Sequence, residues 1–519
     1  MESNIMLVLH SHIPFVKRQG RWPFGEVWLF EAMAETYIPF VRTWLRLREE
    51  GIKAPITLSL SPPLLDQLSS PYIQKEFVAY LREREDKAAE EERYYMSVAE
   101  PNMASLASFY HRFYRDIRRD FTLELDSNLV NVFKQLKDNG EVEIMATAAS
   151  HAYLPLLDRK SLQHQILWGI RAYENYFACE PEGFWLPECG YFQGIEDLLI
   201  ARQLRYFYVD SHALEGGKPL GDSSIVDPEL TCQDEMFANT GLSTYRPYKI
   251  KDKDILVFGR NAMVSQQVWS ADYGYPGDKD YREFHRESPR SGFKYWRITD
   301  RNNGIKLVYE PEQARLKARQ HAHHFINSIR NTGREAAHLG YDQPLIIACY
   351  DTELFGHWWW EGIDWLEEVV RGIAHSQELD FILPAQIHFP DGEAQVFESS
   401  WGTGGKHYIW KNKETQWMWD IIRQASNEFE ELNKSSIDSD VKAASLAQAL
   451  RELILIESSD WLFMVTNNLT RDYAMKRFFE HYTKFLRLVN AIRDENFSEN
   501  YVDWLMNVEV EDDFLSFLK

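Results

Sequence analysis

Cysteine, basic residues and long apolar runs are all scarce in this sequence. It has four Cys in 519 residues and no CxxC pair, which excludes a disulfide framework and a cysteine zinc site. Lys and Arg number 57 against 79 Asp and Glu, and this net charge of −22 argues against binding to nucleic acid or an anionic membrane. The apolar run near the N-terminus covers only residues 5–9, and no stretch approaches the length of a membrane span. We therefore expect a soluble, cytoplasmic protein.

Aromatic residues, in contrast, are abundant. The chain holds 17 Trp and 26 Tyr although its mean hydropathy is −0.44, and eight of the Trp lie between residues 358 and 419. Core packing accounts for most Trp in most proteins. The alternative is a set of stacking platforms for sugar rings, whose faces are apolar and whose rims carry hydroxyls. In an acidic chain without a basic groove, this composition favours a neutral polyhydroxy ligand over nucleic acid.

Short apolar runs typical of buried strands alternate with helical sequence along the first 380 residues or so. The runs cover residues 5–10, 56–60, 142–147, 184–186, 206–209, 255–258, 345–350 and, less clearly, 381–383. Strands buried on both faces are nearly continuous in apolar residues, and their alternation with helices predicts parallel βα units, which favour a barrel. The fold class we expect is therefore α/β.

Polar or ionisable residues follow nearly every one of these runs. They are His10, His12, Ser61, His151, Glu188, Asp210, Arg260 and Asp351. In a parallel barrel the carboxyl ends of the strands meet on one face, where active sites are assembled from loops. The pattern therefore predicts a site at that face.

Other segments define the domain organisation. Residues 81–95 carry mixed charges at helical spacing and begin a predicted helical insertion over 81–140. The predicted barrel comprises residues 1–80 and 141–396, and a C-terminal α-helical domain covers 397–519, with helices at 414–432, 435–458 and 472–494. Residues 214–244, rich in Gly, Pro, Ser and Asp, form a long loop that we expect on the catalytic face.

Two carboxylates stand out at strand ends. Glu188 lies in FWLPECGY and Asp351 in CYDTELFGHWWWEG. Glycosidic bond cleavage needs two such groups, one protonated to assist the leaving oxygen and one ionised to attack or to activate water. Apolar neighbours raise a carboxyl pKa, and Trp358 to Trp360 could do so for Asp351. A salt-bridge or capping role for either carboxylate is the alternative.

Histidines suggest a second hypothesis, a metal-dependent hydrolase. His10 and His12 form an HxH pair after the first strand, and His151, His212 and Asp351 could complete a zinc site. Sugar contacts or a structural role would use the same imidazoles without metal. The histidines at 321, 323 and 324 lie mid-helix, where a solvated or packed helix face is the simpler interpretation.

Four tryptophans lie in loop-like sequence. Trp401 and Trp410 flank the glycines of SSWGTGGKHYIWKN, which permit a tight backbone that presents the two rings. Trp22 and Trp269 stand in similar settings near strand ends. Each could stack on a sugar or pack in the core.

Dense, ordered motifs along nearly the whole chain resemble the 1,4-α-glucan branching enzymes of glycoside hydrolase family 57. These are VLHSHIPFV (8–16), WPFGEVWLFEAMAETYIP (22–39), EVEIMATAASHAYLPLL (141–157), FWLPECGY (184–191), QVWSADYGYPGD (267–278), CYDTELFGHWWWEG (349–362), SSWGTGGKHYIWKN (399–412) and SSDWLFM (458–464). The resemblance implies an incomplete (β/α)7 barrel with a helical insertion and a C-terminal helical domain that closes over the cleft.

The resemblance also implies roles for particular residues. Glu188 would be the nucleophile that forms a glycosyl-enzyme intermediate, and Asp351 the general acid/base, with the two carboxyls about 5–5.5 Å apart if the enzyme is retaining. The residues implied to contact the glucan are His10, His12, Trp22, His151, Asp210, Arg260, Trp269, Trp401 and Trp410. The substrate would be amylose, amylopectin or a glycogen-like polysaccharide, and the mechanism needs no metal or other cofactor.

One feature departs from the family pattern. Family branching enzymes carry a Tyr near the tip of the long loop, thought to favour transfer over hydrolysis, but residues 214–244 contain no Tyr and Tyr245 is the first one after them. Either Tyr245 lies at the base of the loop or the Tyr function is missing. Since water competes with an acceptor hydroxyl for the same intermediate, an α-amylase or 4-α-glucanotransferase of the same family is the alternative.

Overall fold

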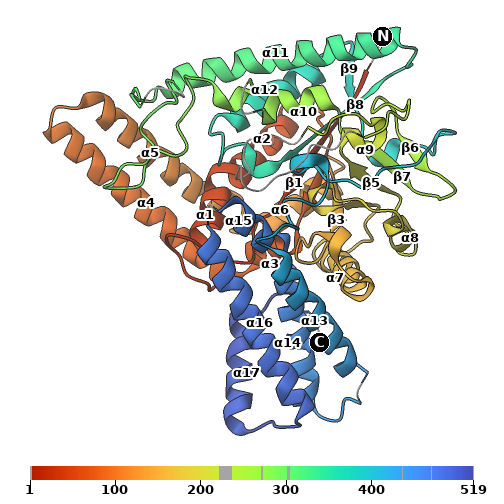
Figure 1. The fold of residues 1–519 in the computed structure, drawn as a ribbon. Coiled ribbons are helices and arrows are strands. Elements are labelled where there is room, and N and C mark those ends of the chain that lie inside the picture. The colour runs from red at the N-terminus through yellow and green to blue at the C-terminus, as the bar shows by residue number, and fades with distance from the viewer. Residues whose placement is uncertain are drawn as a thin grey trace.

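A mostly parallel β-sheet forms the centre of the protein (Figure 1). The computed structural model describes residues 3–220, 237–270, 273–300, 304–434, 436–468 and 470–517. Within these residues the strands are β1 Ser3–Ser11, β2 Ile56–Leu60, β3 Val142–Thr147, β4 Gly183–Trp185, β5 Tyr206–Val209, β6 Tyr248–Ile250, β7 Leu256–Gly259, β8 Leu345–Asp351, β9 Leu379–Phe381 and β10 Glu393–Ala394. Their order is β10-β6-β7-β5-β4-β3-β2-β1-β8, with β9 beside β1. Among these described strands, β6 and β7 are the one antiparallel pair.

The sheet curls towards closure between β7 and β8. The N–H of Asn261, just after β7, donates to the carbonyl of Ile347 in β8 at 2.8 Å. Side chains alternate across β1, so that Met6 and Val8 join an apolar cluster inside the curl while Leu7 packs outward in the main core. The α/β fold and the incomplete parallel barrel expected from the sequence are confirmed.

Helices surround this barrel. They are α1 Glu26–Ala32, the π-helix η1 Met33–Tyr37, α2 Ile38–Glu49, α7 Arg159–Phe177, α8 Ile195–Ile200, α9 Ser211–Glu215, α10 Ala262–Trp269, α11 Pro311–His338 and α12 Gly362–Ala374. The histidines at 321 and 324 lie in α11, as expected. There, the ring Nδ1 atoms of His321 and His324 bond the hydroxyls of Tyr281 and Tyr275 at 2.8 and 2.7 Å.

The predicted helical insertion is present between β2 and β3. Its helices are α3 Pro62–Ser69, α4 Pro71–Ser97, α5 Pro101–Arg119 and α6 Leu129–Asp138. The long helices α4 and α5 project from the barrel as a pair (Figure 1, orange). The charged residues 81–95 form the second half of α4, which begins earlier than expected, with Pro71 at its first turn. The division of the chain at 80/81, 140/141 and 396/397 stays a prediction.

The C-terminal segment folds as helices packed around a core of their own (Figure 1, blue). They are α13 Gln416–Leu432, α14 Asp440–Ile456, α15 Ser459–Asn467, α16 Arg471–Arg493 and α17 Glu499–Glu511. The predicted helix over 435–458 begins later, because the Ser439 side chain caps α14 by accepting the Lys442 N–H. No described helix is long and apolar enough to cross a membrane.

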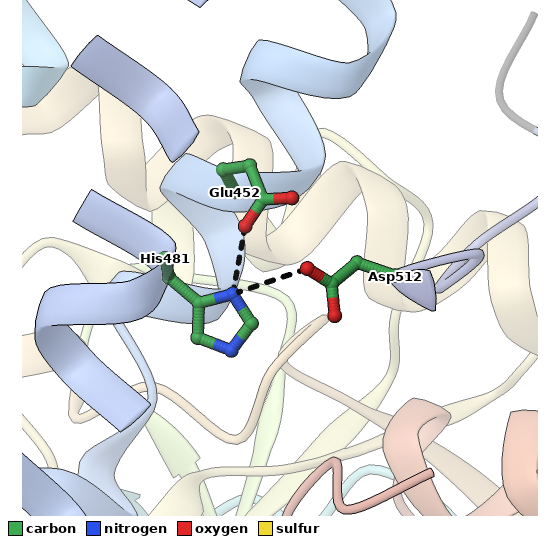
Figure 2. A group of neighbouring side chains, drawn as sticks. All are labelled: Glu452, His481 and Asp512. Carbon is green, nitrogen blue, oxygen red and sulfur yellow. Dashed lines mark hydrogen bonds and ion pairs between the residues drawn. The ribbon is translucent and has the colours of Figure 1, made fainter. Parts of the chain in front are cut away.

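A buried cluster of charged side chains lies inside these C-terminal helices (Figure 2). His481 Nδ1 lies 2.7 Å from Glu452 Oε2 and 3.9 Å from Asp512 Oδ2. A metal ion could bind to three side chains of this type and spacing. However, Lys484 already pairs with Asp512 at 2.5 Å, and Arg477 Nη2 donates to His481 Nε2 at 2.8 Å. The positive charge that the carboxylates need is thus supplied by protein.

The same cluster joins the helical domain to the barrel. Gln19, which follows β1, donates from Nε2 to Asp512 at 3.0 Å and accepts a hydrogen bond from Arg477. Lys17 forms an ion pair with Asp513 at 2.5 Å. The segment after β1, which also carries His12, is therefore held by the C-terminal helices.

Candidate active site

Glu188 occupies a strained turn at the end of β4. Its φ of 63° lies in the left-handed region that a residue with a Cβ rarely adopts. Trp401 stabilises this conformation of Glu188 through two hydrogen bonds. The Trp401 backbone N–H donates to the Glu188 carbonyl at 2.9 Å, and the indole Nε1 donates to the Glu188 Oε2 at 2.7 Å. The turn aims the carboxyl at the end of the barrel where the sequence predicted a site.

Asp351 ends β8 and pairs in register with His10 of β1. Burial raises the pKa of Asp351 to about 7, opposed by the charges of His12 and Arg260. Burial also raises the pKa of Glu188 to about 8, with the Trp401 hydrogen bond opposing the shift and the charge of Asp351 adding to it. The charge of Asp351 thus acts on Glu188, which places the two carboxyls near each other at this end of the barrel.

Three imidazoles gather beside the acids. His10 Nε2 lies 2.8 Å from His151 Nε2, and the rings of His12 and His151 stack at 4.0 Å. Burial lowers the pKa of both His10 and His151 well below the ordinary value, so both rings are neutral near pH 7. His10 Nδ1 is buried without a hydrogen-bond partner among the described residues. Neutral imidazoles of this kind suit hydrogen bonds to sugar hydroxyls.

Asp210 and Arg260 form a buried ion pair behind Trp401. Arg260 donates to both Asp210 oxygens, at 3.1 and 2.7 Å, and its guanidinium lies 5.2 Å from the Trp401 ring centroid. Burial disfavours the Asp210 carboxylate, but Arg260 and His212 more than offset this, and the pKa of Asp210 falls below its ordinary value. In this arrangement the pair supports Trp401, the residue that holds Glu188.

The other predicted tryptophans differ in exposure. Trp22 and Trp269 are 81% and 40% exposed, so both residues are accessible to a ligand. Trp410 is 1% exposed and stacks on Tyr153 at 4.0 Å. The expectation that Trp410 contacts glucan is therefore corrected to a packing role. Gly404 and Gly405 have left-handed φ values within the tight backbone expected from the sequence, but that turn buries Trp410.

Comparisons with known proteins identify the family. The sequence pattern described as glycosyl hydrolase family 57 matches residues 6–393, and that of the 1,4-alpha-glucan branching enzyme C-terminal region matches 421–519. A 1,4-alpha-glucan branching enzyme of Thermococcus kodakarensis is 36% identical over 516 residues, covering 95% of this chain and 74% of its own length.

The chain belongs to glycosyl hydrolase family 57.

Two solved structures superpose closely on this chain. A branching enzyme of Pyrococcus horikoshii is 33% identical, with a TM-score of 0.90 over 100% of this chain and 96% of that one. The alpha-amylase AmyC of Thermotoga maritima is 29% identical, with a TM-score of 0.82 over 99% and 98%. One of these two similar proteins is thus named a branching enzyme and the other an alpha-amylase.

The long loop of this family-57 chain is described only at its two ends. The predicted loop tip falls within residues 221–236, which lie outside the described residues. Gly217 and Phe237 pair as the loop begins and ends, and His212 Nε2 contacts the Gly405 carbonyl at 3.1 Å, which places this stem beside the Trp401 segment.

Tyr245 lies far from Asp351. Its carbonyl accepts the N–H of Leu345, where β8 begins. Asp351 is six residues further along β8, and at about 3.3 Å per residue this amounts to about 20 Å. Tyr245 therefore cannot replace a loop-tip Tyr beside the acids.

Sequence reasoning missed several polar residues at this family-57 site. Glu353, two residues after Asp351, accepts the His12 N–H at 3.0 Å and a hydrogen bond from Tyr37 in the π-helix η1. Burial raises the pKa of Glu353 to about 8, with the Tyr37 hydrogen bond opposing this shift. Asp460 of α15 contacts His12 Nε2 at 2.9 Å. Glu353 and Asp460 both lie within the family motifs quoted above, so the motifs could have indicated these two residues from the sequence.

Within the described part of the chain, the histidines of the metal hypothesis do not form a metal-like ligand set. Among the described residues, the group of His, Cys, Asp and Glu side chains with metal-like spacing is the Glu452 cluster. His10 and His12 instead engage His151, Ser61 and Asp460. His212 lies with Asp210 and Gly405, apart from the HxH pair.

The raised pKa of Glu188 predicts a pH-dependent effect on stability. Between the ordinary value of 4.5 and about 8, an unfolded chain ionises this carboxyl while the folded protein keeps its proton, so stability falls as pH rises through this window. Gln at this position does not titrate and can still accept the Trp401 bond. We expect Glu188→Gln to raise Tm by about 1–3 °C at pH 8 and by less at pH 5. Scanning calorimetry at both pH values checks this, and an equal difference at the two would contradict it.

Proposed function

We propose that this chain is a retaining 1,4-α-glucan branching enzyme. The observation that carries the proposal is the pair of interacting buried carboxyls, Glu188 and Asp351, at the same end of a family-57 barrel. A C-terminal segment with the branching-enzyme pattern supports it. The substrate is an α-1,4-glucan such as amylose, amylopectin or a glycogen-like polysaccharide. A cytoplasmic place of action and a part in glycogen biosynthesis belong to the same proposal.

The chemistry proceeds in two steps with one proton shared between the acids. In the molecules in which the shared proton lies on Asp351 and Glu188 is ionised, Asp351 gives this proton to the glycosidic oxygen while the Glu188 carboxylate attacks C1, so that the reducing-end fragment leaves and a glycosyl ester forms. Asp351, now ionised, then takes a proton from a 6-hydroxyl of another glucan, whose oxygen attacks C1 and releases Glu188. The product is an α-1,6 branch, with the configuration at C1 retained.

The neighbouring residues prepare this pair. The Trp401 hydrogen bond favours the Glu188 anion that must attack. The rings of His10 and His151 are neutral, so neither adds a charge that would fix the proton on one acid. His10 Nδ1, which has no partner among the described residues, can bond a sugar hydroxyl. Trp22 and Trp269 supply exposed faces on which glucose units stack. The distance of 5–5.5 Å between the two carboxyls, typical of retaining enzymes, is part of the proposal.

Hydrolysis is the second candidate activity. It is favoured by the absence of Tyr from residues 214–244 and by the likeness to an α-amylase of Thermotoga maritima. If the loop leaves the intermediate open to water, water takes the place of the acceptor hydroxyl in the second step. The same acids would then act as an α-amylase, or as a 4-α-glucanotransferase when a 4-hydroxyl attacks.

Product analysis on amylose separates these activities. We expect α-1,6 linkages, measured by debranching followed by chain counting, to accumulate faster than new reducing ends. Reducing ends in excess would contradict branching and support hydrolysis. New α-1,4 chain lengths without either product would indicate 4-α-glucanotransfer.

EDTA should leave the rate unchanged, and a loss of activity that added Zn²⁺ restores would support the metal hypothesis instead.

A further inference from the structure

An open cavity of about 570 Å³ lies on the flank of the barrel, beside the neighbouring helices α10 and α11 (Figure 1). This volume falls within the range of small-ligand pockets in proteins, roughly 300–1,000 Å³. The reacting acids and the imidazoles beside them are not among the residues that line it. Its wall includes Gln267, Tyr273, Asp278, Thr299, His321 and His324.

We propose that this cavity is a second glucan-binding site, which holds a stretch of an α-1,4-glucan chain away from the bond that reacts. The inference goes beyond the proposed function and rests on it only for the identity of the sugar. Gln267 lies two residues before Trp269, a predicted glucan contact at the end of α10. The cavity therefore adjoins the part of α10 that carries this tryptophan.

Two histidines in the wall are held in fixed orientations by tyrosines. His321 Nδ1 lies 2.8 Å from the Tyr281 hydroxyl, and His324 Nδ1 lies 2.7 Å from the Tyr275 hydroxyl. The Tyr275 ring also stacks on His321, with the ring centroids 4.7 Å apart. Because each Nδ1 already has a partner, Nε2 is the nitrogen that each ring can offer to a ligand.

The charges in the wall favour a neutral ligand. Asp278 Oδ2 lies 3.5 Å from His321 Nε2, and Asp300 and Lys279 add one charge of each sign. Burial lowers the pKa of His321, with the charge of Asp278 opposing the shift, so this ring is mostly neutral near pH 7. An anion would meet two carboxylates, and among the described residues these side chains lack the spacing of a metal site. Sugar hydroxyls can donate to the carboxylates and bond the imidazoles.

Tyr273 supplies the aromatic surface that a sugar ring needs. It lines the cavity and is 58% exposed. Its hydroxyl donates to Gln266 Oε1 at 2.6 Å, which anchors the tip of the ring. The apolar face of a glucose unit can stack on such a ring while its hydroxyls bond the polar groups beside it. An accessible aromatic ring next to oriented polar side chains is the combination expected for a polyhydroxy ligand.

Another part of the wall carries a strained residue. Thr299 has a φ of 60°, in the left-handed region that β-branched residues rarely adopt. Its N–H donates to the Lys279 carbonyl at 2.8 Å, and its Oγ1 accepts the Leu307 N–H at 2.9 Å. These contacts hold the strained backbone in place, and strain of this kind is concentrated at ligand sites.

Substitutions in two different parts of the wall test the site. Tyr273→Ala removes the stacking surface, whereas Tyr273→Phe keeps the ring and loses only the hydroxyl. Gln267→Ala changes the wall on α10, in a residue type that favours helix. The matched control is Tyr94→Ala, an accessible tyrosine on α4. Each variant would be made in the parent and in Glu188→Gln, whose loss of turnover leaves the glucan of a gel intact, with Tm recorded to show folding.

Affinity electrophoresis in glycogen gels measures binding in the Glu188→Gln background. We expect Tyr273→Ala to weaken retention by about fivefold to tenfold, because a stacking contact is lost. Gln267→Ala should weaken it by about twofold to threefold, through a lost hydrogen bond. Tyr273→Phe and the control Tyr94→Ala should stay within about twofold of the background, because neither loses a stacking face in the cavity.

Kinetics in the active enzyme place the site away from the reacting bond. For Tyr273→Ala the KM for amylose should rise by about fivefold to tenfold while kcat stays within about twofold, since a remote contact binds substrate and transition state equally. On α-maltosyl fluoride, whose two glucose units fill only the catalytic centre, kcat/KM should not change.

The inference and the proposed function can fail separately. If Tyr273→Ala keeps both retention and the KM for amylose within twofold, the cavity does not hold glucan. An equal loss on α-maltosyl fluoride would also overturn the inference, because it would place Tyr273 in the catalytic centre. Should Tyr273→Ala fail to fold, unchanged retention of Gln267→Ala would contradict the site. If the parent forms no α-1,6 linkages while Tyr273→Ala still weakens retention, the second site stands and the branching function does not.

Discussion

Glu188→Gln is expected to lower kcat on amylose by about 10⁴-fold or more, because the substitution removes the oxygen that attacks C1. The amide is nearly the same size as the carboxyl, and its oxygen can accept the Trp401 indole hydrogen bond that now binds Oε2. The turn with its left-handed φ should therefore persist. Affinity for glucan should stay within about threefold of the parent, since no group that lines the groove is lost.

Stopped assays of linkage formation and affinity electrophoresis in glycogen would measure these two quantities. Glu182→Gln is the matched control, because Glu182 lies six residues earlier and pairs with Arg205 at an exposed position. That control should retain full activity. Glu188→Gln with more than about one hundredth of the parental kcat would contradict its assignment as nucleophile.

Asp351→Ala is expected to lose turnover in a way that depends on the leaving group. On amylose kcat should fall by about 10³-fold or more, because nothing protonates the departing glycosidic oxygen. On a maltosyl fluoride the first step needs no acid, so the glycosyl ester should still form and its breakdown should become rate-limiting. The control is Asp380→Asn, an exposed acid on β9.

Azide gives the second part of this prediction. An anionic nucleophile needs no general base, so azide should attack C1 of the ester in Asp351→Ala, restore turnover and yield an α-maltosyl azide. The absence of rescue, or a β-configured product, would contradict the acid/base assignment. Nuclear magnetic resonance of the anomeric proton distinguishes the two products.

The fold could be predicted from the sequence where strands are buried on both faces. The apolar runs at 56–60, 142–147 and 206–209 coincide with β2, β3 and β5. The short strands β6 and β10 were not predicted, since a pairing of two or three residues leaves no periodic pattern to detect. β9 lies two residues earlier than expected, an error typical of element boundaries.

The site was predictable to the extent that strand ends define it. Glu188, Asp351, His10 and His151 each follow or end a recognisable strand, and the sheet brings them together. Asp460 was missed because it lies 448 residues from His12 and on a helix of another domain. Hydrophobic patterns describe local structure, and they hold no information on which helix docks against which strand end.

Trp410, in contrast, was expected to contact the glucan but packs in the core. The family resemblance implied that its ring contacts glucan, and the glycine-rich loop left stacking and packing both open, whereas close packing of this loop against Tyr153 buries the ring. Gly402 allows that packing, because a Cβ there would lie 2.9 Å from the Trp410 ring. The same glycines are thus consistent with either outcome, and only the tertiary contacts distinguish them.

The most direct test of the central claim is the mass of the protein during turnover. Asp351→Ala should be incubated with α-maltosyl fluoride, quenched in acid, digested with pepsin and analysed by mass spectrometry. A covalent maltosyl group on the peptide that contains Glu188 is the predicted result. A peptide map in which Glu188 stays unmodified while fluoride is released, or in which the sugar sits on another residue, would contradict the account.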